Sequence, residues 1–63
     1  MKYYYTETVF CGKDGYDVAE VDDTGRVVGR KFMRLDELKY LNRWNATKIT
    51  SEQMNEVYER WKE

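Results

Sequence analysis

The side chain with the greatest intrinsic reactivity in this chain is that of Cys11, the only cysteine. It lies in the stretch CGKDGY, which also contains a GxxG tetrapeptide. A thiol nucleophile needs a general base, usually histidine, and the chain contains no histidine. A free cysteine in a small domain is most often buried, with a high pKa and low reactivity. We therefore expect Cys11 to be a buried core thiol rather than a catalytic group.

The Asp and Glu carboxylates show no arrangement typical of metal binding or of acid–base catalysis. A tetrahedral metal site needs several cysteine or histidine ligands, and the acids between residues 14 and 23 do not follow the spacing of a calcium-binding loop. The remaining acids fall on expected turns and solvated helix faces rather than together in a cleft. The sequence predicts no enzyme activity, no catalytic residue, no metal and no cofactor.

The GxxG tetrapeptide GKDG also occurs in KH-type nucleic-acid modules, where it joins two helices. Here it lies between two segments that are typical of strands, so it fits a hairpin turn better. In this interpretation Lys13 and Asp14 occupy the turn and Gly15 takes the left-handed conformation. Tyr16 then follows the turn as an outward-facing residue.

The elements that must position these residues can be read from composition and spacing. Residues 2–11, 16–22 and 26–34 are rich in Tyr, Val, Thr and Phe, are separated by GKDG and DDTG, and predict three strands. In DDTG, Gly25 is expected to be left-handed. Short turns between consecutive strands give an antiparallel meander in the order 1-2-3, with residues 2–11 as an edge strand.

These turns predict a register that sets Phe10 opposite Val18, Val21 opposite Val27 and Ala19 opposite Gly29. Two sheet faces follow from the alternation of side chains. One is assigned to the core and carries Tyr3, Tyr5, Val9, Cys11, Ala19, Val21, Val27, Gly29 and Met33. The other is assigned to solvent and carries Lys2, Tyr4, Thr6, Thr8, Phe10, Tyr16, Val18, Glu20, Arg26, Val28, Arg30 and Phe32.

The second half of the chain changes to a helical period. Asp36 is expected to cap a short helix over 37–44, and Thr50 with Gln53 forms a capping box for a second helix. That helix has one apolar stripe of Met54, Val57, Tyr58 and Trp61. The whole chain, residues 1–63, is therefore expected to be a single small α+β domain, β-β-β-α-α, with both helices on one sheet face.

Composition narrows the classes of function. A chain of 63 residues buries only about 60% of its unfolded surface, but 16% aromatic content favours an ordered domain. Eleven basic against 12 acidic residues provide no general field for polyanions. The absence of long apolar runs excludes a membrane span, and one cysteine without a secretory signal favours a reduced, cytoplasmic protein.

The aromatic residues and arginines of the solvent-assigned face belong to the types enriched at interfaces. They can simply serve β-propensity and cross-strand packing, or they can bind a partner. Acids in residues 14–23 offset the bases of residues 26–34, which weakens any phosphate-binding stripe. The predicted partner-binding residues are Tyr4, Phe10, Tyr16, Arg26, Arg30 and Phe32.

The sequence thus favours a small non-catalytic module that binds a larger macromolecule through protein–protein contacts, in the style of accessory or inhibitor proteins of phages and mobile elements. One alternative is a single-stranded nucleic-acid-binding protein in which four aromatic residues stack on bases and two arginines contact phosphates. Those residues are Tyr4, Phe10, Tyr16 and Phe32, with Arg26 and Arg30. Another is a structural homo-oligomer, for example a homodimer through the edge strand of residues 2–11.

Overall fold

The computed structural model describes residues 1–61, with the side chain of Trp61 left aside. The chain forms a mixed α+β fold in which three antiparallel strands make a meander, so the expected fold class is confirmed. A short fourth strand was not foreseen; it pairs parallel with β1 and gives the order β3-β2-β1-β4. The elements are β1 (Lys2–Phe10), β2 (Lys13–Val21), β3 (Val27–Arg34), η1 (Leu35–Glu37), α1 (Leu38–Arg43), β4 (Thr47–Lys48) and α2 (Ser51–Trp61).

The first hairpin turns at Cys11 and Gly12, not at GKDG. Both residues have positive φ, +52° and +76°, as a two-residue type I′ turn requires. Phe10 consequently pairs with Lys13 instead of Val18, and Gly15 lies inside β2 opposite Thr8. The expected register and the left-handed Gly15 are therefore wrong. A shift from residue 18 to residue 13 is five positions, and an odd shift exchanges the faces of β1 relative to β2.

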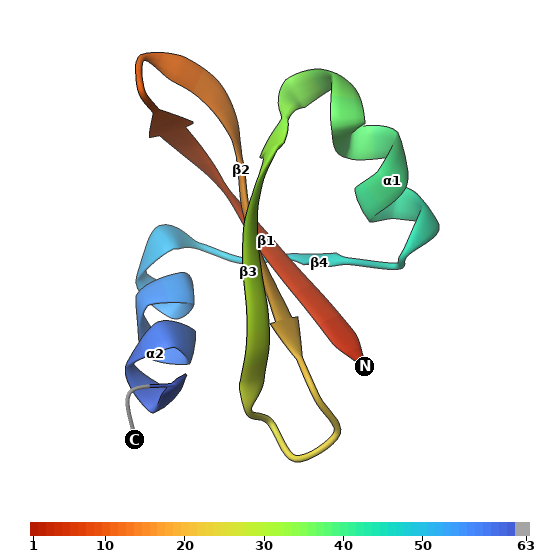
Figure 1. Cartoon of the computed structure of the whole chain (residues 1–63), viewed down its shortest axis with the longest axis vertical. Coiled ribbons are helices and arrows are strands. Elements are labelled where there is room, and N and C mark those ends of the chain that lie inside the picture. Colours follow the sequence, from red (N-terminus) through yellow and green to blue (C-terminus); the bar gives the residue numbers. More distant parts are fainter. Residues whose placement is uncertain (62–63) are drawn as a thin grey trace.

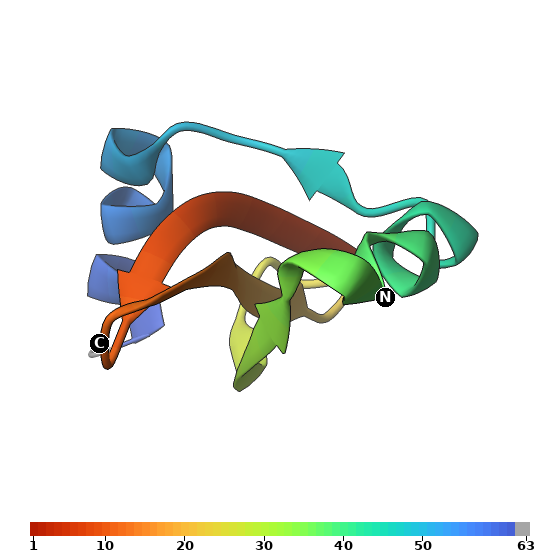
Figure 2. The ribbon, with the colours of Figure 1, turned by 90° about the horizontal axis from the view of Figure 1, so that it is seen from above.

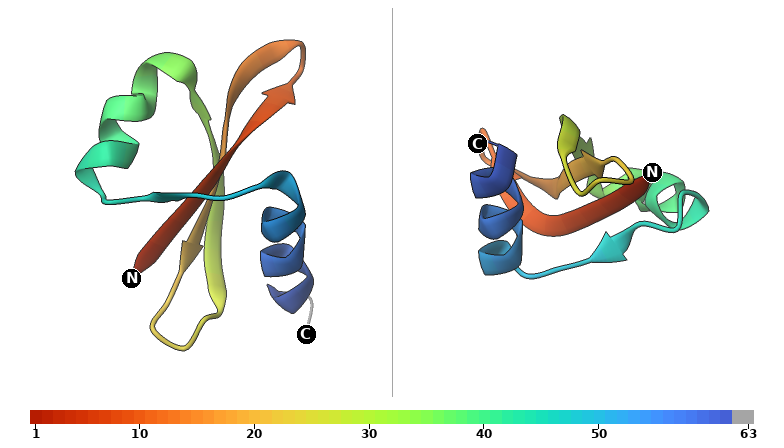
Figure 3. Two further views of the ribbon diagram at one scale, coloured as in Figure 1. Left: turned by 180° about the vertical axis from the view of Figure 1, so that it is seen from behind. Right: turned by 90° about the horizontal axis from the view of Figure 1, so that it is seen from below.

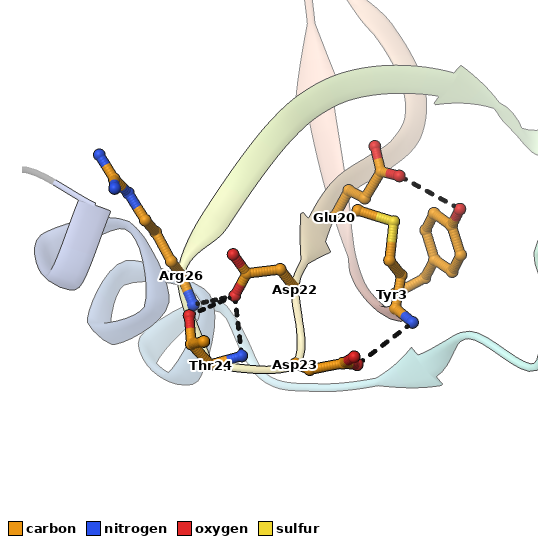
Figure 4. A network of polar contacts seen from close by, with 7 residues as sticks. Tyr3, Glu20, Asp22, Asp23, Thr24 and Arg26 are labelled. Atoms are coloured by element: carbon orange, nitrogen blue, oxygen red, sulfur yellow. Dashed lines mark hydrogen bonds and ion pairs between the residues drawn. The ribbon is translucent and has the colours of Figure 1, made fainter.

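The second hairpin follows the prediction. Gly25 has φ +87°, and its N–H donates to the carbonyl of Asp22 at 3.0 Å. The Asp22 carboxylate also accepts bonds from the Thr24 hydroxyl (2.6 Å) and from the backbone N–H groups of Thr24 and Arg26 (3.0 Å each), as Figure 4 shows. Val21 faces Val27 as expected, but a bulge beyond this pair sets Glu20, not Ala19, opposite Gly29.

The two helices lie on opposite faces of the sheet rather than on one face (Figures 1 and 2). On the face that we call the α1 face, Tyr16, Val18 and Met33 form a buried cluster with Leu41 of α1. On the α2 face, Ala19, Val21 and Val27 are buried, as is Met54 of α2. The expectation of one shared face is wrong because the observed register places apolar side chains on both faces, and each face needs a cover.

The segment after α1 crosses the edge of β1 before α2 begins, which Figure 3 shows from behind. Tyr4 and Tyr5 pair with Thr47 and Lys48, and the Ile49 N–H donates to the Tyr5 carbonyl at 2.9 Å.

Both helix starts can be compared with the sequence prediction. The capping box at α2 is confirmed, since the Thr50 N–H donates to Gln53 Oε1 (3.0 Å) and the Gln53 N–H donates to Thr50 Oγ1 (3.1 Å). The predicted cap Asp36 lies instead within η1, where Glu37 accepts a bond from the Arg34 N–H. In the apolar stripe of α2, Met54 is buried and Val57 and Tyr58 are half-buried, while the Trp61 side chain lies outside the described part.

Candidate protein-binding surface

The structure separates the six residues that the sequence predicted to bind a partner. Phe10, Phe32, Arg26 and Arg30 are exposed, and Tyr4 is half-buried. Tyr16 is 8% exposed and packs edge-on against Tyr5 on the α1 face, with ring centroids 5.4 Å apart. The prediction that Tyr16 faces outward is therefore wrong, because it depended on the incorrect register of the first hairpin.

Phe10 and Phe32 form a pair on the α2 face that we call the Phe patch. Their ring centroids are 5.5 Å apart with planes tilted by 40°, and the side chains are 60% and 37% exposed. The Phe32 ring lies directly over Gly15, since a Cβ there would collide with this ring and with the Met33 carbonyl. Gly15 is thus needed for space rather than for backbone freedom, and it lets the Phe32 ring approach β2 closely.

An open depression of about 340 Å³ lies beside the Phe patch. It has an apolar part, supplied by the two phenylalanines, and a charged part from neighbouring strands. Its lining residues are Thr8, Phe10, Asp17, Arg30, Lys31 and Phe32. Apolar surface next to fixed polar groups is the usual composition of a protein-binding site.

Asp17 joins the sheet to α2 at the margin of this depression. Its two carboxylate oxygens accept bonds from Nε and a terminal nitrogen of Arg30, each at 3.1 Å, and Tyr58 Oη donates to it at 2.8 Å. The Arg30 guanidinium also lies over the Tyr58 ring, 4.2 Å from the centroid. Arg30 is therefore an oriented group with its charge partly neutralised, not an unpaired cation available to phosphate.

This network shifts the titration of its members. Burial, together with the hydrogen bond to Asp17, raises the pKa of Tyr58 well above its ordinary value. The bonds to Asp17 also raise the pKa of Arg30. At the second hairpin, the hydrogen bonds donated by the Thr24 hydroxyl and the Arg26 N–H lower the pKa of Asp22. None of these groups is thereby placed near neutrality, where general acid–base chemistry operates.

Cys11 lies at the tip of the first hairpin and is exposed, so the prediction of a buried thiol is wrong. The turn places it next to Phe10 and at the same end of the sheet as two further exposed apolar residues. These are Val9 (65% exposed), which the sequence assigned to the core, and Leu35 (51%). They line a second depression of about 410 Å³ with Glu7, Thr8, Asp14 and Gly15. Apolar surface therefore occurs on both faces at this end of the sheet.

The expected edge strand β1 is covered by β4 over part of its length, and β3 is the other outer strand of the predicted meander. β1 is paired with β4 at Tyr4 and Tyr5, so it is not an edge strand there, whereas β3 has β2 as its only neighbour in the described sheet. The exposed side chains of β3 include Arg30, Lys31 and Arg34. Only Arg30 has an acidic partner among residues 1–61, because Lys31 and Arg34 lie opposite Val18 and Gly15.

Comparison with known proteins gives no further guide: no family model, no curated protein and no solved structure matches this chain. Within residues 1–61, no group of three or more acids, cysteines or histidines is arranged to hold a metal ion. Over the same residues, no helix has the length and apolar character needed to cross a membrane. A function for this chain therefore has to be inferred from its own geometry.

Proposed function

We propose that this protein is a small, non-catalytic binding module that acts through protein–protein contacts on a larger macromolecule, with the Phe patch as its anchor. The observation that supports this most directly is the exposure of Phe10 and Phe32 in a fixed, mutually packed arrangement. Binding energy at interfaces is concentrated in a few large side chains that fill pockets on a partner. Anchors ordered before binding lose less conformational entropy on association.

A protein partner is favoured over a single-stranded nucleic acid by the placement of the aromatic residues. A stacking surface for successive bases needs several open rings and nearby free cations. Tyr16 is buried, and Tyr4 is half-buried in a hollow that Val57 and Arg60 of α2 also line. Arg30 is bound to Asp17, and Arg26 lies at the second turn, at the other end of β3 from Phe32.

The biological role that we propose is that of a cytoplasmic accessory or inhibitor protein, of the kind that phages and mobile elements encode. The Phe patch would occupy a site on a host protein and block or adapt it. A standard interface covers about 800 Å² of each partner, and the Phe patch would anchor one such interface, so binding itself would be the activity.

The test is recovery of a partner from native cells with tagged wild-type protein and with Phe10→Ser/Phe32→Ser. The matched control is Val28→Ser, because Val28 is an exposed apolar residue (50%) of β3 that does not line the depression beside the patch. We expect wild type and control to recover the same protein, to bind it when both are purified, and the double variant to fail at both while keeping its circular dichroism spectrum.

Two further measurements separate the alternatives. Binding of short oligonucleotides that weakens steeply with salt would favour the nucleic-acid interpretation. A dimer in sedimentation experiments that is lost in the double variant would favour a homo-oligomer. Recovery of the purified partner by the double variant at undiminished affinity would overturn the proposal.

A further inference from the structure

The outer edge of β3 is the longest stretch of the described sheet without a neighbouring strand. β3 spans Val27–Arg34 and is the terminal strand in the order β3-β2-β1-β4. An unpaired edge presents a row of backbone donors and acceptors that another extended segment can use. On the opposite side of the sheet, Thr47 and Lys48 pair with Tyr4 and Tyr5 of β1, so the free stretch there is shorter and covers residues 6–10.

The charges along β3 specify what such a segment must carry. Val27–Arg34 contains three bases and no acid. Asp17 is bound to Arg30, but Lys31 and Arg34 have no ion pair in the described part of the chain. Lys31 Nζ lies 5.3 Å from the centroid of Trp44, so it is held near the sheet and next to the edge. An acidic segment would provide ion-pair partners for both Lys31 and Arg34.

We propose that the edge of β3 accepts an extended, acidic segment of a protein partner as an additional strand. This inference rests on the proposed function, since it assigns the partner of the same surface: the depression beside the Phe patch is lined by Arg30, Lys31 and Phe32 of this strand. A segment paired with β3 therefore passes directly along the Phe patch.

A second copy of this chain is a poor occupant of the edge. Antiparallel self-pairing centred on Phe32 would set Arg30 opposite Arg34, since each lies two residues from the centre. Pairing centred on Lys31 would set Lys31 opposite itself. Like charges directly opposite each other on neighbouring strands are destabilising, so self-pairing of β3 is disfavoured in these two registers.

The side chains of β3 predict the pattern of the bound segment. Lys31 and Phe32 point to opposite faces, and Arg34 shares the face of Phe32. Favourable cross-strand pairs need an acid opposite Lys31, an apolar or aromatic residue opposite Phe32, and an acid opposite Arg34. In a parallel segment the order is acid, apolar, any residue, acid; in an antiparallel segment it is reversed.

The test begins with selection from a display library of random octapeptides on the folded protein. The expected result is enrichment of peptides that carry this pattern and lack proline. Lys31→Glu/Arg34→Glu should weaken the best peptide by about tenfold or more, since two attractive pairs become repulsive. The control Lys39→Glu/Arg43→Glu has the same charge change on exposed residues of α1 and should leave affinity unchanged. Failure to enrich acidic peptides, or equal losses in both variants, would overturn the inference.

Strand addition is then distinguished from charge attraction alone by the backbone. The Arg34 N–H is already bound to Glu37 Oε1 at 3.2 Å. The other outward amides of β3 should exchange rapidly with solvent in the free protein and become protected with the selected peptide, because a paired strand covers outward N–H groups. A peptide of identical sequence with N-methyl groups on alternate residues keeps its charge but loses donors, so it should bind about tenfold or more weakly. Equal binding of the two peptides would refute strand pairing.

The two proposals can fail separately. Loss of the native partner in Phe10→Ser/Phe32→Ser, without protection of β3 amides by any acidic peptide, would leave the Phe patch as the site and exclude the edge. Protection of β3 with undiminished recovery of the native partner by the phenylalanine variant would remove the Phe patch as anchor and keep the edge.

Discussion

Two aromatic pairs with nearly equal ring separations lie on opposite faces of this small sheet, one edge-on at 88° and the other tilted by 40°. The centroids of Tyr5 and Tyr16 are 5.4 Å apart, and those of Phe10 and Phe32 are 5.5 Å apart. Tyr16 is covered by the cluster that includes Leu41 of α1 and is 8% exposed, whereas Phe10 is 60% exposed. Both pairs therefore have ring contacts, but only the tyrosine pair includes a ring that is buried away from water.

The difference separates stability from recognition within one sheet. Burial of apolar area is the main stabilising term, while a ring contact at an exposed site adds little beyond it. The tyrosine pair should therefore hold the fold together. The phenylalanine pair keeps part of its apolar area exposed for a partner, most of all at Phe10, and replacing the pair should change binding more than folding.

The largest expected effect is the contrast between Tyr16→Ala and Phe10→Ala. Tyr16→Ala leaves a cavity beside Val18, Met33 and Leu41 and should lower the free energy of unfolding by about 3 kcal/mol, whereas Phe10→Ala should cost less than about 1 kcal/mol. Urea denaturation followed by circular dichroism measures both. Equal losses would show that Phe10 belongs to the core and would end the distinction between the pairs.

The next effect concerns the glycine under the Phe patch. Gly15→Ala puts a methyl group against the Phe32 ring and the Met33 carbonyl and should cost about 2 kcal/mol. Gly29→Ala is the matched control. The atom nearest to the added Cβ is Glu20 Oε2 at 3.0 Å, which is the mobile end of a side chain. This variant should cost clearly less in the same urea measurement. A harmless Gly15→Ala would mean that Phe32 does not lie on β2.

The sequence predicted the second turn and the start of α2 because a few residues there strongly favour one local conformation. Asp22 and Gly25 determine the second turn through side-chain bonds and a positive φ, and Thr50 with Gln53 determines the start of α2. At the first turn, Cys11 has no preference for positive φ, so the residue pair Cys-Gly is a weaker signal than GKDG. The tyrosines at positions 3 to 5 show no alternation that could correct the register.

Geometry explains why only some of the six predicted partner-binding residues share a face in the structure. The first hairpin differs from the expected register by five residues and the bulge in β3 shifts it by one more, and each odd shift exchanges faces. The two exchanges cancel between β1 and β3, so Phe10, Phe32 and Arg30 stay together as predicted. They do not cancel for β2, which is why Tyr16 moved to the opposite face. The two-residue strand β4 has no sequence signal of its own.

A smaller effect is expected at the link between α2 and the Phe patch. Tyr58→Phe removes the hydrogen bond to Asp17 and should lower the free energy of unfolding by about 1 kcal/mol. The control is Tyr40→Phe at an exposed tyrosine of α1, which should be neutral. Loss of stability in both variants alike would show that the bond to Asp17 contributes nothing specific.

The same residue gives a pH dependence with a defined sign. The pKa of Tyr58 is raised in the folded state, so as pH rises above about 10 the unfolded chain releases this proton first. The stabilisation is therefore complete below about pH 10 and is lost above it. Wild type should lose stability more steeply than Tyr58→Phe in this alkaline range, as urea midpoints between about pH 9 and 11 would show; parallel profiles would contradict the assignment.

The smallest effect is expected at the tip beside the Phe patch, where Cys11 has φ +52°. Asparagine tolerates this conformation, and Asn-Gly is the preferred pair for a type I′ turn, so Cys11→Asn should raise the free energy of unfolding by about 0.5 kcal/mol. Cys11→Ser removes the thiol without this backbone preference and should give no gain. Because Cys11 is exposed and its removal leaves the phenylalanines in place, recovery of the partner should survive both changes. A gain that comes equally with serine would assign the effect to the thiol and not to the turn, and loss of the partner would extend the binding surface to the tip itself.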